Sequence, residues 1–207
     1  MGFFDWIASM FSSVPKTNII VSANFTLLNP EYLSNWNDCM IGPQWKAQAE
    51  TASATILSNQ AKYVEVQNAT GVPWYLVGCL HYRESDFDFN TCLHNGDPLP
   101  GPTVNVPAGR GPFSSWSLAA IDALQYDHLD QNKDWSIARC LYASEEYNGF
   151  GYRMKHGTQS PYLWSGTNIY TYGKYDSDGS FNPNALDDQL GVAAILKQMT
   201  NDGSITW

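Results

Sequence analysis

The stretch VPWYLVGCLHYRES, residues 72–85, decides the fold class. Pro73 stands where a first-turn proline opens a helix, and the positions that follow are mostly apolar until Arg83 and Glu84. The pattern therefore predicts a largely buried helix that ends in a carboxylate. A carboxyl group held against apolar walls is costly to ionise, so its pKa rises toward the range of a useful general acid. A plain salt bridge between Glu84 and Arg83 is the structural alternative.

Helical patterns lie on both sides of this stretch. They predict helices over residues 31–40, 43–57 with an extension to 71, 114–129 and 134–147, and a last helix after Pro183. Between them, residues 95–98 (Asn-Gly-Asp-Pro) are of the types that form turns. Residues 103–106 (TVNV) alternate between polar and apolar side chains, as in a short strand. Residues 87–112 are therefore predicted to form a small β-hairpin or loop lobe. The fold class that follows is mainly α (α+β), a helical domain with one small β lobe.

The length of the chain, 207 residues, suits one domain with a sizeable core. We expect residues 30–207 to form that domain and residues 1–29 to pack on it or to lie at a membrane surface. The apolar residues of this N-terminal segment would share one helical face: Phe3, Ile7, Met10 and Phe11. No run approaches the ~20 apolar residues of a transmembrane helix, so none is predicted.

The composition of the chain limits which partners it can bind and in which compartment it is made. The net charge of −9 argues against nucleic acid and anionic membranes as partners. Aromatic residues make up 14% of the chain, which is compatible with a carbohydrate-binding cleft as well as with a rigid aromatic core. The four cysteines form no CxxC pair, and no secretory signal is evident, so we expect free thiols in a protein made in the cytoplasm.

The end of the central helix also carries a family resemblance. Residues 84–87 (Glu-Ser-Asp-Phe) fit the pattern E-S-x-F, which resembles the active-site helix of the lysozyme-like superfamily, above all of goose-type lysozymes and lytic transglycosylases. Residues 146–149 (Glu-Tyr-Asn-Gly) resemble the tyrosine–asparagine–glycine motif that these families carry at the end of a later helix. The stretches VPWYLVGCLHYRES, HNGDPL, EEYNGFGYR and SPYLWS are together similar to phage endolysins and bacterial lysozyme family proteins, over roughly residues 30–200.

This resemblance implies an enzyme that acts on peptidoglycan glycan strands without a cofactor. Glu84 matches the catalytic glutamate, which protonates the glycosidic oxygen as the bond breaks. Tyr147 and Asn148 match the motif residues that line the cleft and bind the sugar. Asp97 matches a second carboxylate that positions water or stabilises positive charge on the sugar, and Thr103 fits the arrangement of phage-type lysozymes. The alternative for Asp97 is that it only caps its turn.

Two further side chains are candidates for sugar binding. His94 could lie near the cleft in the predicted β lobe, with a solvent-exposed loop histidine as the alternative. Trp164 could stack on a sugar ring, with a place in the core as the alternative. His81 and Glu84 could share a metal ion, but no further ligands cluster near them in the sequence, so no metal site is predicted.

The chain departs from the transglycosylase pattern after residue 87. Those enzymes usually continue with small residues that end in Gly-Leu-Met-Gln, whereas this chain reads DFNTCLHNGDPL. The departure favours hydrolysis by water, so the expected function is that of a muramidase, a monomer that reaches the cell wall as a phage endolysin does. A lytic transglycosylase, a chitinase and a non-catalytic wall-binding module remain open alternatives.

Overall fold

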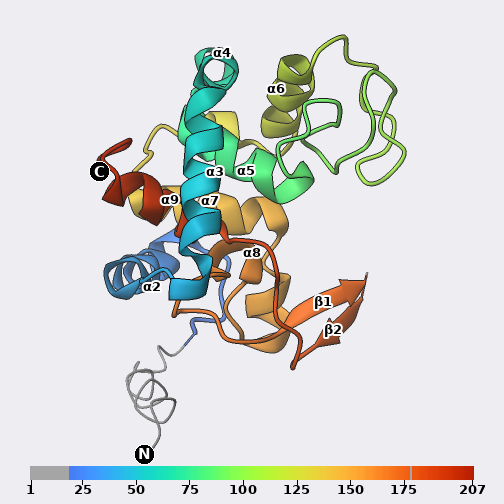
Figure 1. The fold of residues 1–207 in the computed structure, drawn as a ribbon. Helices are drawn as coiled ribbons and strands as arrows, with labels where there is room; N and C mark the ends of the chain where they lie inside the picture. The colour runs from blue at the N-terminus through green and yellow to red at the C-terminus, as the bar shows by residue number, and fades with distance from the viewer. Residues whose placement is uncertain (1–18, 178) are drawn as a thin grey trace, which may run out of the picture.

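The computed structural model describes residues 19–177 and 179–207. Its elements in chain order are α2 (Phe25–Asp38), η1 (Pro43–Trp45), α3 (Lys46–Ser58), α4 (Gln60–Thr70), α5 (Trp74–Ser85), α6 (Trp116–Tyr126), η2 (Leu129–Gln131), α7 (Ile137–Asn148), η3 (Tyr152–His156), α8 (Pro161–Trp164), β1 (Lys174–Ser177), β2 (Ser180–Asn182) and α9 (Val192–Asn201). The described chain is mainly helical with one small antiparallel sheet, so the predicted fold class is confirmed (Figure 1). The apolar N-terminal face expected from Phe3 to Phe11 lies outside the described residues.

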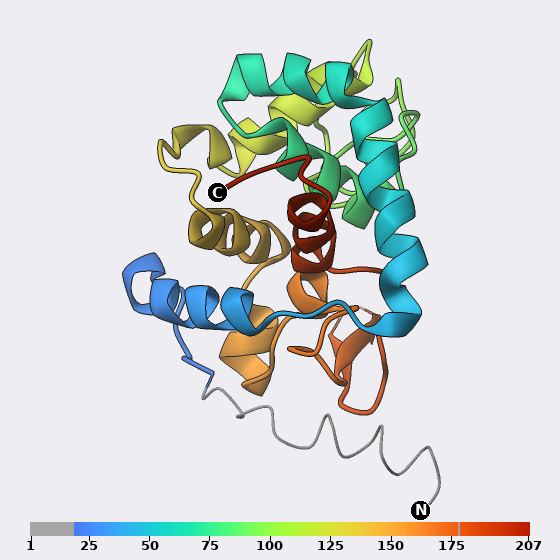
Figure 2. The same ribbon diagram turned by 60° about the vertical axis from the view of Figure 1, so that its left-hand side comes forward.

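The predicted central helix is α5, and it is buried along most of its length. It packs against α3, α4 and α9, which surround it in both views of the ribbon (Figure 2). Gly78 makes the contact with α3 possible, because a Cβ at this position would come within 2.7 Å of Cγ2 of Ile56. The four cysteines are buried free thiols, as expected.

A buried ion cluster joins α2, α7 and η3. Arg153 donates to Glu145 through Nε at 3.1 Å and Nη2 at 2.8 Å, and to Glu31 through Nη1 at 2.8 Å. Tyr32 donates a further hydrogen bond to Glu145. The backbone of Ile20 completes the cluster, since its N–H donates to Glu31 at 2.8 Å and its carbonyl accepts from Arg153 at 3.0 Å. The cluster therefore fixes the beginning of the described chain to the helical core.

Of the two predicted alternatives for residues 87–112, the structure shows the loop lobe and not the β-hairpin. This segment is a long loop whose only ladder contact is an isolated bridge between Thr91 and Pro98. The sheet is instead formed by β1 and β2, with Tyr175 opposite Phe181, at the other end of the molecule (Figure 1). Proline has no N–H to give to a ladder, and the loop contains many prolines: Pro98, Pro100, Pro102, Pro107 and Pro112.

Three predicted helix boundaries also move. α2 begins before residue 31 because the Asn24 side chain accepts from the N–H of Leu27 at 3.3 Å and caps it, and Pro30 is accommodated inside the helix. α7 begins later than residue 134 because the Asp134 side chain accepts from the N–H of Ser136 at 2.9 Å in a turn of its own. The last helix begins only at residue 192, so the residues directly after Asn182-Pro183 are irregular.

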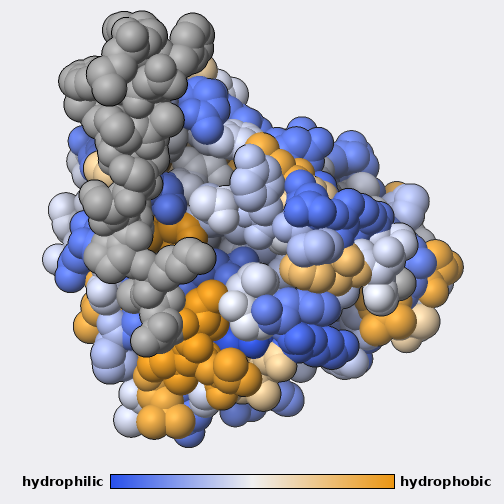
Figure 3. Space-filling view, turned by 90° about the horizontal axis from the view of Figure 1, so that it is seen from below, coloured by the Kyte–Doolittle hydropathy of each residue, from blue (hydrophilic) through white to orange (hydrophobic). Residues whose placement is uncertain are grey.

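The surface carries apolar side chains in several separate places. Seen from below, it is mostly hydrophilic, with hydrophobic residues gathered in a few areas (Figure 3). Such scattered exposure is ordinary for a globular protein. Within the described residues, no helix has the length and apolar character to cross a bilayer.

Candidate functional site

Glu84 lies in the last turn of α5, where the helix ends abruptly. Asp86 has φ 50° and Phe87 has φ 67°, a left-handed conformation that a bulky side chain rarely adopts. The Phe87 ring packs back onto Tyr82 of the helix, with the ring centroids 5.2 Å apart. Consecutive strained residues persist only where packing enforces them, and they are frequent at functional sites. The turn therefore holds Glu84 in a defined place.

Glu84 does not form the plain ion pair with Arg83. The Arg83 guanidinium donates instead to Asp187 at 3.1 Å and to the carbonyl of Leu190 at 3.0 Å. Glu84 Oε1 accepts a hydrogen bond from the Tyr162 hydroxyl at 2.8 Å. Within residues 19–177 and 179–207 no other group donates to Glu84, so its second oxygen, Oε2, has no protein partner there.

Glu84 has the protonation behaviour of a general acid. Burial raises the pKa of its carboxyl to about 7, while the Tyr162 hydrogen bond and the Arg83 charge oppose the rise and the Asp127 charge adds to it. The carboxyl group therefore carries a proton at pH values below about 7. Because Oε1 accepts from Tyr162, that proton belongs on Oε2. A half-buried carboxylic acid whose O–H has no protein acceptor in the described chain is the species that acid catalysis requires.

The end of α7 lies close to Glu84. The Tyr147 hydroxyl donates to the carbonyl of Leu93 at 2.7 Å and so ties α7 to the loop that follows α5. Burial, and after it the negative charge of Glu84, raises the pKa of Tyr147 and of Tyr162 well above the ordinary value, so both phenols remain protonated donors. Asn148 lies beside Tyr147 at the helix end, where it is exposed. The structure thus brings Tyr147 close to Glu84 and places Asn148 next to Tyr147 at the end of α7.

Asp127 is a neighbour of Glu84 that the sequence analysis did not single out. It caps the C-terminus of α6, on a segment far from α5 in the sequence. Burial raises the pKa of Asp127, the charge of His128 opposes this, and the charge of Glu146 adds to it. Its own charge raises the pKa of Glu84 and of Tyr147 in turn. Two carboxyl groups with raised pKa values therefore share this region.

The Asp97 carboxylate is hydrogen-bonded to residues of its own loop. Its Oδ2 accepts from the backbone N–H groups of Val104 at 2.8 Å and Asn105 at 2.9 Å, and its Oδ1 accepts from the Asn105 amide at 2.6 Å. Chiefly the Asn105 backbone hydrogen bond holds the pKa of Asp97 below its usual value. The backbone of the turn approaches Glu84, because a Cβ on Gly96 would lie 3.2 Å from the Glu84 carbonyl oxygen. These contacts favour the turn-capping alternative, and the role of second carboxylate stays a prediction.

Thr103 and His94 are also turned into the loop, which corrects their assignment to sugar binding. Thr103 is 3% exposed, donates to the Pro107 carbonyl and accepts from the Arg110 N–H at 2.9 Å. The His94 side chain is 1% exposed and its Nε2 lies 2.9 Å from Asp122, so it is not an exposed loop histidine either. In a loop without strand ladders, side chains such as these satisfy the buried polar groups.

Trp164 is a core residue, so the prediction that it stacks on sugar is wrong. Its side chain is fully buried, and α8 packs against α7 and α9. Tyr162, in the same helical turn, is the residue that reaches Glu84. Positions two apart on a helix point to nearly opposite sides, so only one of the two rings could face Glu84. The sequence indicated the segment but not which of its aromatic side chains faces the site.

The chemistry of this region rests on carboxyl and phenol groups. In the described part of the chain, no group of three or more His, Cys, Asp or Glu side chains is placed to hold a metal ion. Glu84, Tyr162, Tyr147 and Asp127 come from four different helices or helix ends. No protein-family model, curated protein or solved structure matches this chain significantly.

Proposed function

We propose that this protein is a muramidase, a glycoside hydrolase that cuts the β-1,4 bond between N-acetylmuramic acid and N-acetylglucosamine in peptidoglycan. The observation that carries the proposal is the state of Glu84, a carboxyl with a pKa of about 7, one oxygen bound by Tyr162 and the other without a protein donor in the described chain. The substrate class comes from the resemblance of residues 84–87 and 146–149 to the motifs of lysozyme-like enzymes.

In this proposal Glu84 gives the proton on Oε2 to the glycosidic oxygen while the bond from that oxygen to the sugar breaks. The carboxylate left behind keeps the hydrogen bond from Tyr162 and the nearby charge of Arg83, and both favour the ionised form. Tyr147 and Asn148, at the end of α7, contact the sugar. The enzyme needs no cofactor and works on the cell wall as a monomer.

The second carboxyl group of the reaction assists the attacking water or stabilises the developing positive charge. Asp127 and Asp97 are the two candidates. Asp127 interacts electrostatically with Glu84, whereas the Asp97 carboxylate accepts three hydrogen bonds that hold its own loop. We therefore propose Asp127, rather than Asp97, as the second carboxyl group of the reaction.

Digestion of purified peptidoglycan, followed by mass spectrometry of the products, tests the proposed function. Muropeptides with reducing N-acetylmuramic acid ends support it. Anhydro-muropeptides would show a lytic transglycosylase, cleavage of chitin oligomers without cleavage of peptidoglycan would show a chitinase, and intact strands with bound protein would show a wall-binding module. Each of these three results contradicts the muramidase proposal.

Tyr162→Phe is expected to move the alkaline limb of the pH–rate profile upward by roughly one pH unit. The Tyr162 hydrogen bond lowers the pKa of Glu84, so its loss raises that pKa above about 7 and keeps the acid protonated to higher pH. Initial hydrolysis rates measured between pH 5 and about 9 give the limb directly. A limb that stays in place, or moves downward, would contradict the assignment of Glu84 as the titrating acid.

Asp127→Asn is expected to move the alkaline limb of the pH–rate profile downward. The negative charge of Asp127 raises the pKa of Glu84, so its removal lowers that pKa, and the loss of a second carboxyl group should lower the rate by on the order of 100-fold. Asp97→Asn is the matched control, expected to lower the rate by less than about tenfold and to leave the limb where it was. The reverse pattern would make Asp97 the second carboxylate.

A further inference from the structure

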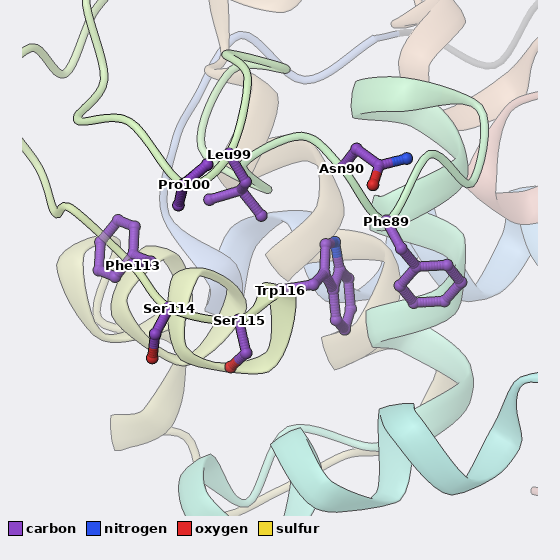
Figure 4. A pocket seen from close by; sticks show the side chains of 8 residues that line it. All are labelled: Phe89, Asn90, Leu99, Pro100, Phe113, Ser114, Ser115 and Trp116. Carbon is purple, nitrogen blue, oxygen red and sulfur yellow. The ribbon is translucent and has the colours of Figure 1, made fainter.

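A shallow hollow of about 300 Å³ lies between the loop that follows α5 and the first turn of α6. Three segments line it, residues 89–90, 99–100 and 113–116, and their side chains surround the opening in Figure 4. The residues around Glu84 do not take part in it. The hollow is therefore separate from the candidate catalytic site.

Its apolar walls are aromatic rings that neighbouring side chains hold in place. Trp116 is 5% exposed, and its ring packs against Phe89 at 4.9 Å and His81 at 4.5 Å between centroids. Phe113, on the other side of the opening, stacks on the His94 ring at 5.7 Å. Phe113 is partly exposed and therefore offers a flat contact surface that loses little conformational entropy when a ligand binds, whereas the buried Trp116 ring forms the base of the wall.

Polar groups stand at the edges of these rings. Trp116 Nε1 is buried and has no acceptor within the described residues, and Figure 4 shows this nitrogen on the edge of the indole that faces Asn90 and Leu99. A buried N–H without an acceptor is costly, and an acceptor brought into the hollow would relieve that cost. The Asn90 side-chain Nδ2 donates a hydrogen bond to Asp88 at 2.8 Å, so the side-chain oxygen of Asn90 is available to accept from a ligand. Ser114 adds an exposed hydroxyl at the rim.

The electrostatics select a neutral ligand. Among the described residues, no charged side chain lines the hollow, and the chain has a net charge of −9. The Lys62 ammonium lies over the Phe89 ring, 3.7 Å from its centroid, but does not line the hollow. A phosphate or carboxylate would therefore lose hydration without a cation in the lining, and the net negative charge of the protein would disfavour it. A small ring with an apolar face and uncharged polar groups around its edge fits both the walls and the rim.

We propose that this hollow is an accessory carbohydrate site that binds one uncharged pyranose unit of a glycan, at a distance from Glu84. The face of the sugar lies on Phe113, a sugar oxygen accepts from the edge of the Trp116 indole, and a hydroxyl donates to Asn90. N-acetylglucosamine units satisfy the requirement for neutrality, whereas the carboxylate of N-acetylmuramic acid does not. The inference goes beyond the proposed function and does not depend on it, since it concerns binding alone.

The test is a titration of ¹⁵N-labelled full-length protein carrying Glu84→Gln with N,N′,N″-triacetylchitotriose, followed by NMR. We expect saturable shifts of the Trp116 indole N–H and of the backbone amides of residues 114–116. In the same background Phe113→Ala should weaken the affinity measured at these signals by roughly tenfold. Phe181→Ala, which removes a ring stacked on His156 at 3.7 Å in the β hairpin, is the matched control and should change nothing.

Absence of shifts at residues 114–116, shifts confined to the surroundings of Glu84, or an unchanged affinity in Phe113→Ala would each overturn the proposal. If Phe113→Ala fails to fold, Asn90→Ala replaces it, because it removes the proposed acceptor of the sugar hydroxyl from an exposed position and should weaken the affinity by roughly fivefold. Saturable binding here by a protein that does not cut peptidoglycan would refute the muramidase proposal and leave this site standing. Cleavage without binding here would do the reverse.

Discussion

Replacing Glu84 with glutamine is expected to lower the rate of peptidoglycan hydrolysis by on the order of 100-fold or more. Glutamine preserves the size of the side chain and an oxygen that can accept from Tyr162, but it has no acidic proton for the glycosidic oxygen. Turbidity clearing of permeabilised Gram-negative cells, with reducing ends counted on purified peptidoglycan, measures the effect. Glu50→Gln on the exposed face of α3 is the matched control and should keep the wild-type rate.

The stability of the same variant separates catalysis from folding. The folded pKa of Glu84, about 7, lies above its ordinary value of 4.5, so between these pH values the folded protein holds a proton that the unfolded chain has released. Ionisation therefore costs folding stability as pH rises through this window, and a neutral glutamine avoids that cost. We expect Glu84→Gln to melt at or above the wild-type temperature at pH 8. A variant that clears cells as fast as the wild type would refute the role of Glu84.

Arg153→Met is expected to lower the free energy of unfolding by about 3–5 kcal/mol. The Arg153 and Glu145 side chains are fully buried and that of Glu31 is 2% exposed, so the substitution leaves two carboxylates in the core without a cation. A loss of this size is a large part of the stability of an ordinary domain. Urea denaturation followed by tryptophan fluorescence measures this loss. The two unfolding free energies are comparable when their dependence on urea concentration, the m-value, is the same in both variants.

Two further variants identify the cause of that loss. Replacement of all three charged residues by apolar ones (Glu31→Met, Glu145→Met and Arg153→Leu) should cost less than Arg153→Met alone, because no charge is then left unpaired and only neutral hydrogen-bonding groups lose their partners. Arg139→Met removes an arginine that lies 3.4 Å from the centroid of the Phe25 ring and should cost about 1 kcal/mol or less. If Arg153→Met unfolds at the wild-type urea concentration, the buried cluster contributes no stability.

The sequence was most informative where one local pattern decided the outcome. The run of apolar residues after Pro73 is excluded from water only in a helix that is buried on nearly every face, and α5 is that helix. Gly71 adopts φ 78° and ends α4, as its position after Thr70 predicts. The place of Glu84 at the end of a buried helix could therefore be predicted from the period of the pattern and the position where the pattern stops.

The loop between α5 and α6 shows where local patterns are insufficient. Residues 103–106 have the alternation of a strand, but a strand also needs a partner with free N–H groups, and the surrounding prolines supply few. The backbone there turns around the Asp97 carboxylate instead. The true hairpin at β1 and β2 is short and partly exposed, so its alternation is weak in the sequence.

The surroundings of Glu84 could be predicted only in part, because they depend on long-range packing. Tyr147 was found through its motif, whereas Tyr162 lies 78 positions from Glu84 and reaches it only because α8 packs on α7 and α9. Asp127 follows a helix whose direction relative to α5 no local pattern specifies. Trp164 and His94 were misjudged for the same reason, since aromatic and histidine side chains are equally compatible with a cleft and with a core.

The bonds from Ile20 to the Arg153 cluster make residue 20 part of the core, so a chain shortened beyond it loses contacts on which the fold depends. A polypeptide that starts at residue 19 retains the backbone N–H that satisfies Glu31 and the carbonyl that satisfies Arg153. One that starts at residue 22 leaves both charged groups short of a partner inside the protein. Deleting residues 19–21 therefore has the same effect as a mutation in the middle of the core.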